Sequence, residues 1–239
     1  MFSTLRKILI SGASRGIGKR IAEAAINEGH YISLGLRKSY KFDKSALKIS
    51  NSDESRLIIS EYDAKDKNSC KEWVRKTKID FGSIDTLIHC AGIFKKTELN
   101  FRDKEEKDID DLWKTNVMGP WHLTRAAWEY LIEVKNSRVI VLVSMSGIRS
   151  KGSFAGYSTS KFALMGLSET IRNEGWDKGL RVTTICPGWV NTDMSKEVKS
   201  ISRKEMTQPE DIGIIINTLL KLPNSCIPFN ISINCNLEK

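Results

Sequence analysis

The segment Gly12-Ala13-Ser14-Arg15-Gly16-Ile17-Gly18 comes just after the apolar run Ile8-Leu9-Ile10 and opens a stretch with helical periodicity. In this place Gly12 permits a tight turn, Gly16 lets the backbone approach a phosphate, and Gly18 allows close packing of helix on sheet. The free N–H groups and the positive dipole end at the start of the helix then face a pyrophosphate. The segment therefore predicts a strand–turn–helix unit that binds a dinucleotide.

Short apolar runs alternate with longer helical segments along the rest of the chain. We expect strands at residues 7–11, 31–36, 56–61, 86–89, 138–143, 181–185 and 230–233, and helices at 16–28, 67–77, 109–134, 154–176 and 209–220. Several strands are apolar on both faces, as in parallel sheets covered by helices. The pattern predicts an α/β fold, a single doubly wound Rossmann domain over residues 1–239 whose central parallel sheet has about seven strands.

The composition limits the classes of partner. The net charge of +9 indicates either a solvated basic surface or attraction to anions such as a phosphorylated cofactor. The lysines are scattered and no basic stripe contains interleaved aromatics, so we expect no nucleic-acid partner. No apolar stretch has the length of a membrane span or of a signal sequence, which predicts no membrane partner. The five cysteines form no CxxC pair and no metal-ligand spacing, which predicts free thiols, no bound metal and a cytoplasmic location.

Three residues in the second half of the chain predict chemistry on a carbonyl group. Tyr157 and Lys161 are four residues apart in a helical pattern and therefore project from one face, while Ser144 ends a predicted strand. A tyrosine with its usual pKa of about 10 is a reluctant acid or base at neutral pH. We expect Lys161 to lower that pKa, and Ser144 to donate to the substrate oxygen. This set predicts proton transfer coupled to hydride transfer.

The end of the second predicted strand bears on the choice between NAD(H) and NADP(H). An acid usually holds the 2′-hydroxyl there, but this strand ends Leu36-Arg37-Lys38. Arg37 offers a planar cation for a 2′-phosphate, and Arg15 lies in the glycine turn near the same corner. We therefore favour NADP(H). The alternative is that both arginines are simply exposed, which leaves NAD(H) open.

The third and fourth predicted strands end in further candidate contacts. Asp63, next to Ala64, is expected to accept a hydrogen bond from the adenine amino group, although it would equally serve as a helix cap. In His89-Cys90-Ala91-Gly92 the small residues leave room for the adenosine ribose. Cys90 is either a reactive thiol or, as we prefer, an inert buried one.

The ordered motifs resemble those of the classical short-chain dehydrogenase/reductase family over nearly the whole chain. The family's Thr-Gly-x-x-x-Gly-x-Gly corresponds to residues 11–18, and its Pro-Gly-x-x-x-Thr to residues 187–192. Ser144 matches the catalytic serine by its distance from Tyr157, with Ser146 as the alternative. Asn116 stands at the place of the catalytic asparagine. The family's Asn-Asn-Ala-Gly is replaced by residues 89–92, so we expect a different brace of the sheet or lower stability.

The resemblance implies an oxidoreductase that interconverts a small-molecule carbonyl and a secondary alcohol, with Tyr157 as general acid/base. Lys161 would also hold the nicotinamide ribose, Asn116 would hold a water that relays protons, and Val190 and Thr192 would meet the carboxamide. The catalytic set is Asn116, Ser144, Tyr157 and Lys161. The expected cofactor contacts are Gly12, Ser14, Arg15, Gly16, Ile17, Gly18, Arg37, Asp63, Ala64, Cys90, Ala91, Gly92, Asn116, Tyr157, Lys161, Pro187, Gly188, Val190 and Thr192.

Three further expectations concern the surroundings of this site. The helices at 109–134 and 154–176 form the dimer interface in relatives, so we expect a homodimer or homotetramer. The short polar stretch 193–207 predicts an open pocket, with Phe94 and Trp189 as lining residues. The alternative function is a dinucleotide-sensing protein without turnover, although such a protein would not need the whole Ser/Tyr/Lys/Asn set.

Overall fold

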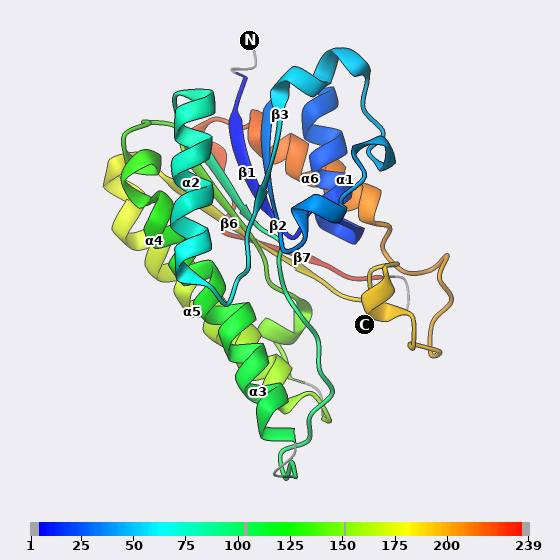
Figure 1. Cartoon of the computed structure of the whole chain (residues 1–239). Coiled ribbons are helices and arrows are strands. Elements are labelled where there is room, and N and C mark those ends of the chain that lie inside the picture. The colour runs from blue at the N-terminus through cyan, green and yellow to red at the C-terminus, as the bar shows by residue number, and fades with distance from the viewer. Residues whose placement is uncertain (1–4, 103–104, 151, 236–239) are drawn as a thin grey trace.

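The computed structural model describes residues 5–102, 105–150 and 152–235, and these ranges form a seven-stranded parallel sheet (Figure 1). The strand order is β3-β2-β1-β4-β5-β6-β7. The strands are β1 (Lys7–Ser11), β2 (Tyr31–Leu36), β3 (Leu57–Glu61), β4 (Thr86–His89), β5 (Arg138–Leu142), β6 (Arg181–Pro187) and β7 (Asn230–Ile233). The chain reverses its winding between β1 and β4, which is where doubly wound sheets bind ligands. The predicted Rossmann fold is confirmed.

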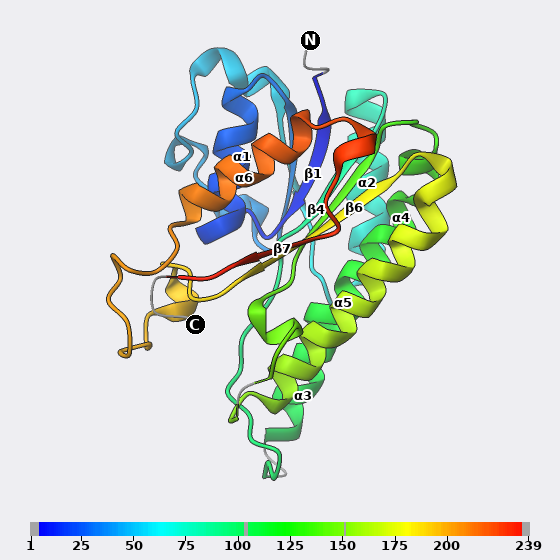
Figure 2. The same cartoon turned by 180° about the vertical axis from the view of Figure 1, so that it is seen from behind.

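Helices cover both faces of the sheet (Figures 1 and 2). One face carries α1 (Gly16–Asn27) and α6 (Pro209–Lys221); the other carries α2 (Lys67–Phe81), α4 (Gly119–Ile132) and α5 (Ala155–Gly175). Side chains alternate along the central strands, so that Ile8 and Ile10 pack toward α1 and α6 while Leu9 packs toward α2 and α4. Burial on both faces explains why these strands are apolar throughout.

The structure corrects the helix predicted at 109–134. It begins earlier, as α3 (Glu106–Trp113), and continues through a π-helical turn (Lys114–Met118) into α4. A π turn adds a residue to the local helical repeat and often occurs at functional sites. Here it contains Asn116. Similarly, α2 runs past the predicted residue 77 and ends at Gly82, whose φ of 75° favours glycine.

The expected alternative brace beside β4 is present. The His89 ring nitrogen Nε2 lies 2.8 Å from the Thr124 hydroxyl of α4. The Ser11 hydroxyl accepts hydrogen bonds from the backbone N–H groups of Cys90 and Ala91 at 3.1 and 3.2 Å. Burial lowers the pKa of His89 to about 3, so its imidazole stays neutral. These contacts tie β4 to its neighbours without the family's asparagine side chains.

Among the described residues no helix combines the length and apolar character that a membrane crossing requires. All five cysteines are free thiols. Within the same ranges no group of three His, Cys, Asp or Glu side chains is placed to hold a metal ion.

Candidate active site

A cavity of about 1470 Å³ runs along the carboxyl edge of the sheet, from the glycine turn after β1 to Tyr157 on α5. Single-ligand pockets usually measure roughly 300–1000 Å³. The cavity therefore has room for a dinucleotide and a substrate together. Of the predicted site residues only Asn116 is not part of its wall. The others line it: Gly12, Ser14, Arg15, Gly16, Ile17, Gly18, Arg37, Asp63, Ala64, Cys90, Ala91, Gly92, Ser144, Tyr157, Lys161, Pro187, Gly188, Val190 and Thr192.

The glycine turn has the shape that a phosphate requires. Gly12 and Gly16 have φ values of +73° and +56°, which side-chain-bearing residues rarely adopt. A Cβ atom on Gly12 would lie 2.6 Å from the Cα of Ala91, and one on Gly16 would lie 3.3 Å from Cγ2 of Thr192. The first turn of α1 contains no acidic residue, so its N–H groups and positive dipole end face the cavity without a competing anion on the helix itself. These residues fit a dinucleotide pyrophosphate.

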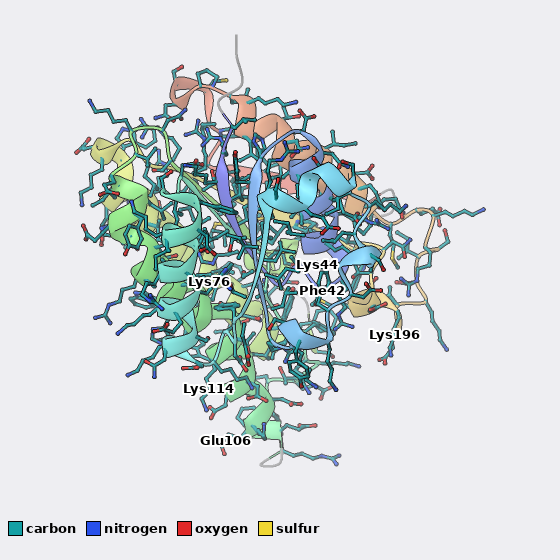
Figure 3. All side chains as sticks on the ribbon, turned by 45° about the horizontal axis from the view of Figure 1, so that its top comes forward. Phe42, Lys44, Lys76, Glu106, Lys114 and Lys196 are labelled. Atoms are coloured by element: carbon teal, nitrogen blue, oxygen red, sulfur yellow. The ribbon has the colours of Figure 1, made fainter. Side chains whose placement is uncertain are left out.

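The segment after β2 brings cations to one end of the cavity. Arg37, Lys38 and Lys41 line it and are exposed. In Figure 3, Phe42 and Lys44 of this segment lie on the same side of the molecule as Lys196, which follows β6, whereas Lys76 and Lys114 lie on the other side. Arg15 lies in the same cavity wall, and its guanidinium is 3.0 Å from Oδ2 of Asp193.

Asp63 lines the cavity, and the alternative role as the N-cap of α2 belongs to another residue, so its contact with the adenine stays a prediction. The N-cap of α2 is Asp66, whose carboxylate accepts from the backbone N–H of Asn68. Asp63 accepts from the backbone N–H of Lys65 at 2.9 Å, while its own N–H donates to the Ser69 hydroxyl at 3.0 Å.

The catalytic candidates converge at the other end of the cavity. Tyr157 and Lys161 project from the first turns of α5, and Lys161 Nζ lies 5.8 Å from the centroid of the Tyr157 ring. Ser144 follows β5 and shares a hydrogen bond with the Tyr157 hydroxyl. Tyr157 is 9% and Lys161 5% exposed. The predicted convergence of these groups is present.

The expected lowering of the Tyr157 pKa by Lys161 is wrong for this structure. Burial raises the pKa of Tyr157 to about 12, and the hydrogen bond with Ser144 is what lowers it from a still higher value. Burial also lowers the pKa of Lys161 to about 8. The Lys161 ammonium group donates to the carbonyl oxygen of Leu142 at 3.0 Å and lies over the ring of Tyr157. Burial likewise raises the pKa of Cys90 to about 12, which favours the inert thiol.

Asn116 lies behind the cavity wall, fully buried in the π-helical turn. Its Oδ1 accepts from the backbone N–H of Ile93 at 2.9 Å, and its Nδ2 donates to the carbonyl of Ile93 and to the Ser160 hydroxyl at 3.0 and 3.1 Å. A Cβ atom on Gly92 would lie 3.4 Å from Asn116 Oδ1 and 3.7 Å from Lys161 Nζ. The side chain thus positions the wall beside Lys161, and the relay water remains a prediction.

A chain of three aromatic rings extends from Tyr157 along the cavity, and the sequence predicted two of the three. The Phe94 ring stands edge-on to Tyr157 at 5.0 Å and to Phe154 at 5.2 Å, and Phe154 stands edge-on to Trp189 at 6.5 Å. All four line the cavity. Sequence reasoning missed Phe154 as a site residue because it was expected only to start a helix. Its isolated bridge with Thr97 brings it to the site.

The stretch 193–207 contributes little apolar surface to the cavity. Met194 lines it and is 52% exposed, whereas Ile201 and Met206 are buried against Cys235. The apolar side chains therefore anchor the stretch to the chain after β7. The open pocket expected from this stretch stays a prediction.

A family model described as "short chain dehydrogenase" matches residues 6–202. Agropine synthesis reductase of Rhizobium rhizogenes is 38% identical over 217 residues, which is 91% of this chain and 49% of that protein. The chain thus spans about half the length of that relative. Oxidoreductase UcpA of Salmonella typhimurium is 32% identical over 220 residues, 91% of this chain and 80% of the relative.

Solved structures share the fold at lower identity. An alcohol dehydrogenase from the archaeon Thermococcus sibiricus, complexed with 5-hydroxy-NADP, has a TM-score of 0.87 and 24% identity, covering 98% of each chain. ElxO with NADP bound has a TM-score of 0.86 and 22% identity, covering 97% of this chain and 98% of that one.

Proposed function

The chain belongs to the short-chain dehydrogenase family of oxidoreductases, and we propose that it uses NADP(H) to interconvert a carbonyl group and a secondary alcohol. One observation carries the proposal: the glycine turn and the Ser144–Tyr157–Lys161 set line a single continuous cavity. When bound, a nicotinamide nucleotide supplies or accepts the hydride. The residues of this chain bind both molecules and move the proton.

Tyr157 is the proton donor in the reducing direction. With its pKa raised to about 12, the phenol holds its proton at neutral pH and can donate it to the substrate oxygen. The Ser144 hydroxyl, which is hydrogen-bonded to Tyr157, orients the substrate oxygen. Lys161, whose ammonium group lies 5.8 Å from the centroid of the Tyr157 ring, would hold the nicotinamide ribose, as the family resemblance implies. Phe94, edge-on to the ring, restricts Tyr157 to this position.

The preference for the phosphorylated cofactor rests on the charges at the other end of the cavity. Arg37, Lys38 and Lys41 line it where an NAD(H)-binding protein would carry an acid. A guanidinium binds phosphate in a bidentate manner. The NADP bound to ElxO and the NADP analogue in the archaeal enzyme support this preference.

We further propose that the chain forms a homo-oligomer. Large aromatic side chains on its helices are exposed, with Trp113 at 44%, Trp121 at 53% and Phe162 at 45%. Exposed aromatics grouped on neighbouring helices are typical of protein contacts.

A carbonyl panel tests the proposed reaction. The purified chain is mixed with NADPH or NADH and with aldehydes, sugars, steroid ketones and acyl thioesters, and loss of the reduced cofactor is followed by absorbance. We expect turnover of at least one compound, with kcat/KM for NADPH at least about tenfold above that for NADH, the effect of one charge-assisted phosphate contact. Tight NADPH binding with no turnover across the panel would instead support a dinucleotide sensor. The reductase name of the Rhizobium relative makes reduction the first direction to test.

A further inference from the structure

An ion pair joins the two sides of the cavity at the glycine turn. Arg15 Nη1 lies 3.0 Å from Asp193 Oδ2, and the two side chains are 74% and 70% exposed. Both residues line the cavity. Arg15 belongs to the turn after β1, whereas Asp193 belongs to the segment after β6. The pair therefore lies at a place where a bound dinucleotide and Asp193 would share one cation.

Asp193 is held in place by its own segment. It follows Thr192, which caps the 3₁₀ turn Asp193–Ser195. The Ser195 hydroxyl donates to the carbonyl of Val190 at 2.6 Å, and Arg203 donates to the carbonyl of Thr192 at 2.9 Å. These bonds hold the backbone on either side of Asp193, and the longer arginine side chain is the partner with more freedom to turn.

We propose that Asp193 competes with the 2′-phosphate of the cofactor for Arg15 and thereby limits the preference for NADP(H) over NAD(H). This inference rests on the proposed function. When Arg15 pairs with the phosphate it leaves Asp193, so the binding of NADP(H) breaks this ion pair. NAD(H) has no 2′-phosphate, so its binding requires no such exchange.

The size of the effect follows from the exposure of the pair. An exposed ion pair contributes at most about 1 kcal/mol, which corresponds to about fivefold in Kd. We therefore expect Asp193→Asn to raise the ratio of Kd for NADH to Kd for NADPH by about threefold to fivefold. The gain should shrink as salt is added, because the groups are open to solvent.

The chain offers a matched control on the same cavity wall. Glu210 also lines the cavity and forms a partly exposed ion pair, but its partner is Arg20 at 2.8 Å. Glu210→Gln removes the same unit of charge without releasing Arg15. A second control is Asp193→Asn in an Arg15→Ala background, where the substitution should no longer change the ratio.

The experiment measures Kd for NADPH and NADH by fluorescence titration of the full chain, without substrate, at low and high salt. A raised ratio in Asp193→Asn alone, lost in the Arg15→Ala background, supports the proposal. An unchanged or lowered ratio, or an equal rise in Glu210→Gln, overturns it. If the unaltered chain itself shows no preference for NADPH, the proposed cofactor is wrong, and that result is distinct from a failure of Asp193 alone.

Discussion

The ammonium group of Lys161 donates a hydrogen bond to the carbonyl oxygen of Leu142, the last residue of β5, at 3.0 Å. The same strand end leads into Ser144, so one element fixes both the cation and the hydroxyl beside Tyr157. The bond also shows why the cation stands over the ring of Tyr157 in this structure. A bound nicotinamide ribose would offer Lys161 further partners, which the family resemblance implies.

The Lys161 charge predicts a pH dependence. Burial lowers its pKa to about 8, so the ammonium form is present below that pH and is lost above it. We expect kcat/KM for NADPH, which reports ionisations of the free protein, to fall as pH rises through about 8. The measurement is a profile from pH 6 to 10 at constant ionic strength. A rate that is flat across pH 8 would contradict a role for the cation.

Lys161→Met should remove activity but stabilise the fold. The drop in pKa from 10.5 to about 8 corresponds to about 3 kcal/mol against the buried charge. This cost applies fully below pH 8 and disappears as pH rises toward 10.5, where the unfolded chain also loses the proton. We therefore expect Tm at pH 7 to rise by several degrees and the gain to shrink at pH 10. A lower Tm at pH 7 would show that the bond to Leu142 outweighs the burial cost.

Arg37→Asp should reverse the cofactor preference. The substitution removes a cation from the proposed phosphate site and supplies an acceptor for a 2′-hydroxyl. We expect Kd for NADPH to rise by roughly 10- to 100-fold and Kd for NADH to stay equal or fall. Lys76→Asp, on the other side of the molecule, makes the same charge change as a control. Equal losses for both nucleotides would remove Arg37 from the phosphate site.

Thr124→Val tests the brace beside β4. The substitution leaves His89 Nε2 buried without its partner at 2.8 Å, which should cost about 1–3 kcal/mol of unfolding free energy. Thr170→Val is the matched control, since its hydroxyl bonds to the carbonyl of Gly166 on the exposed side of α5. Urea denaturation measures both. Equal small effects would mean that the His89–Thr124 contact does not brace the sheet.

Local patterns predicted most of the fold. The strands β1, β2, β4 and β7 have the predicted bounds, because polar or turn residues flank short apolar runs there. The π-helical turn around Asn116 was not predictable, since one extra residue hardly disturbs a 3.6-residue repeat. The hydrogen bonds between the Asn116 side chain and the Ile93 backbone therefore appear only in the structure.

The motifs predicted the site residues, but not their pKa shifts or their ion pairs. Burial raises the pKa of Tyr157, and the Lys161 ammonium group donates to a backbone oxygen 19 positions away, at Leu142. The pairing of Arg15 with Asp193 joins residues 178 positions apart. Neither relationship leaves a periodic or compositional signal in the sequence.

The role of Tyr157 is tested most directly by Tyr157→Phe, which removes the phenol hydroxyl and keeps the ring against Phe94. Single-turnover consumption of NADPH is measured with a carbonyl substrate of the unaltered chain, alongside Kd for NADPH. We predict that the single-turnover rate falls by about 10²- to 10⁴-fold, the usual contribution of a general acid. The Kd for NADPH should change by less than about threefold. A rate within a few fold of the unaltered chain would contradict the account.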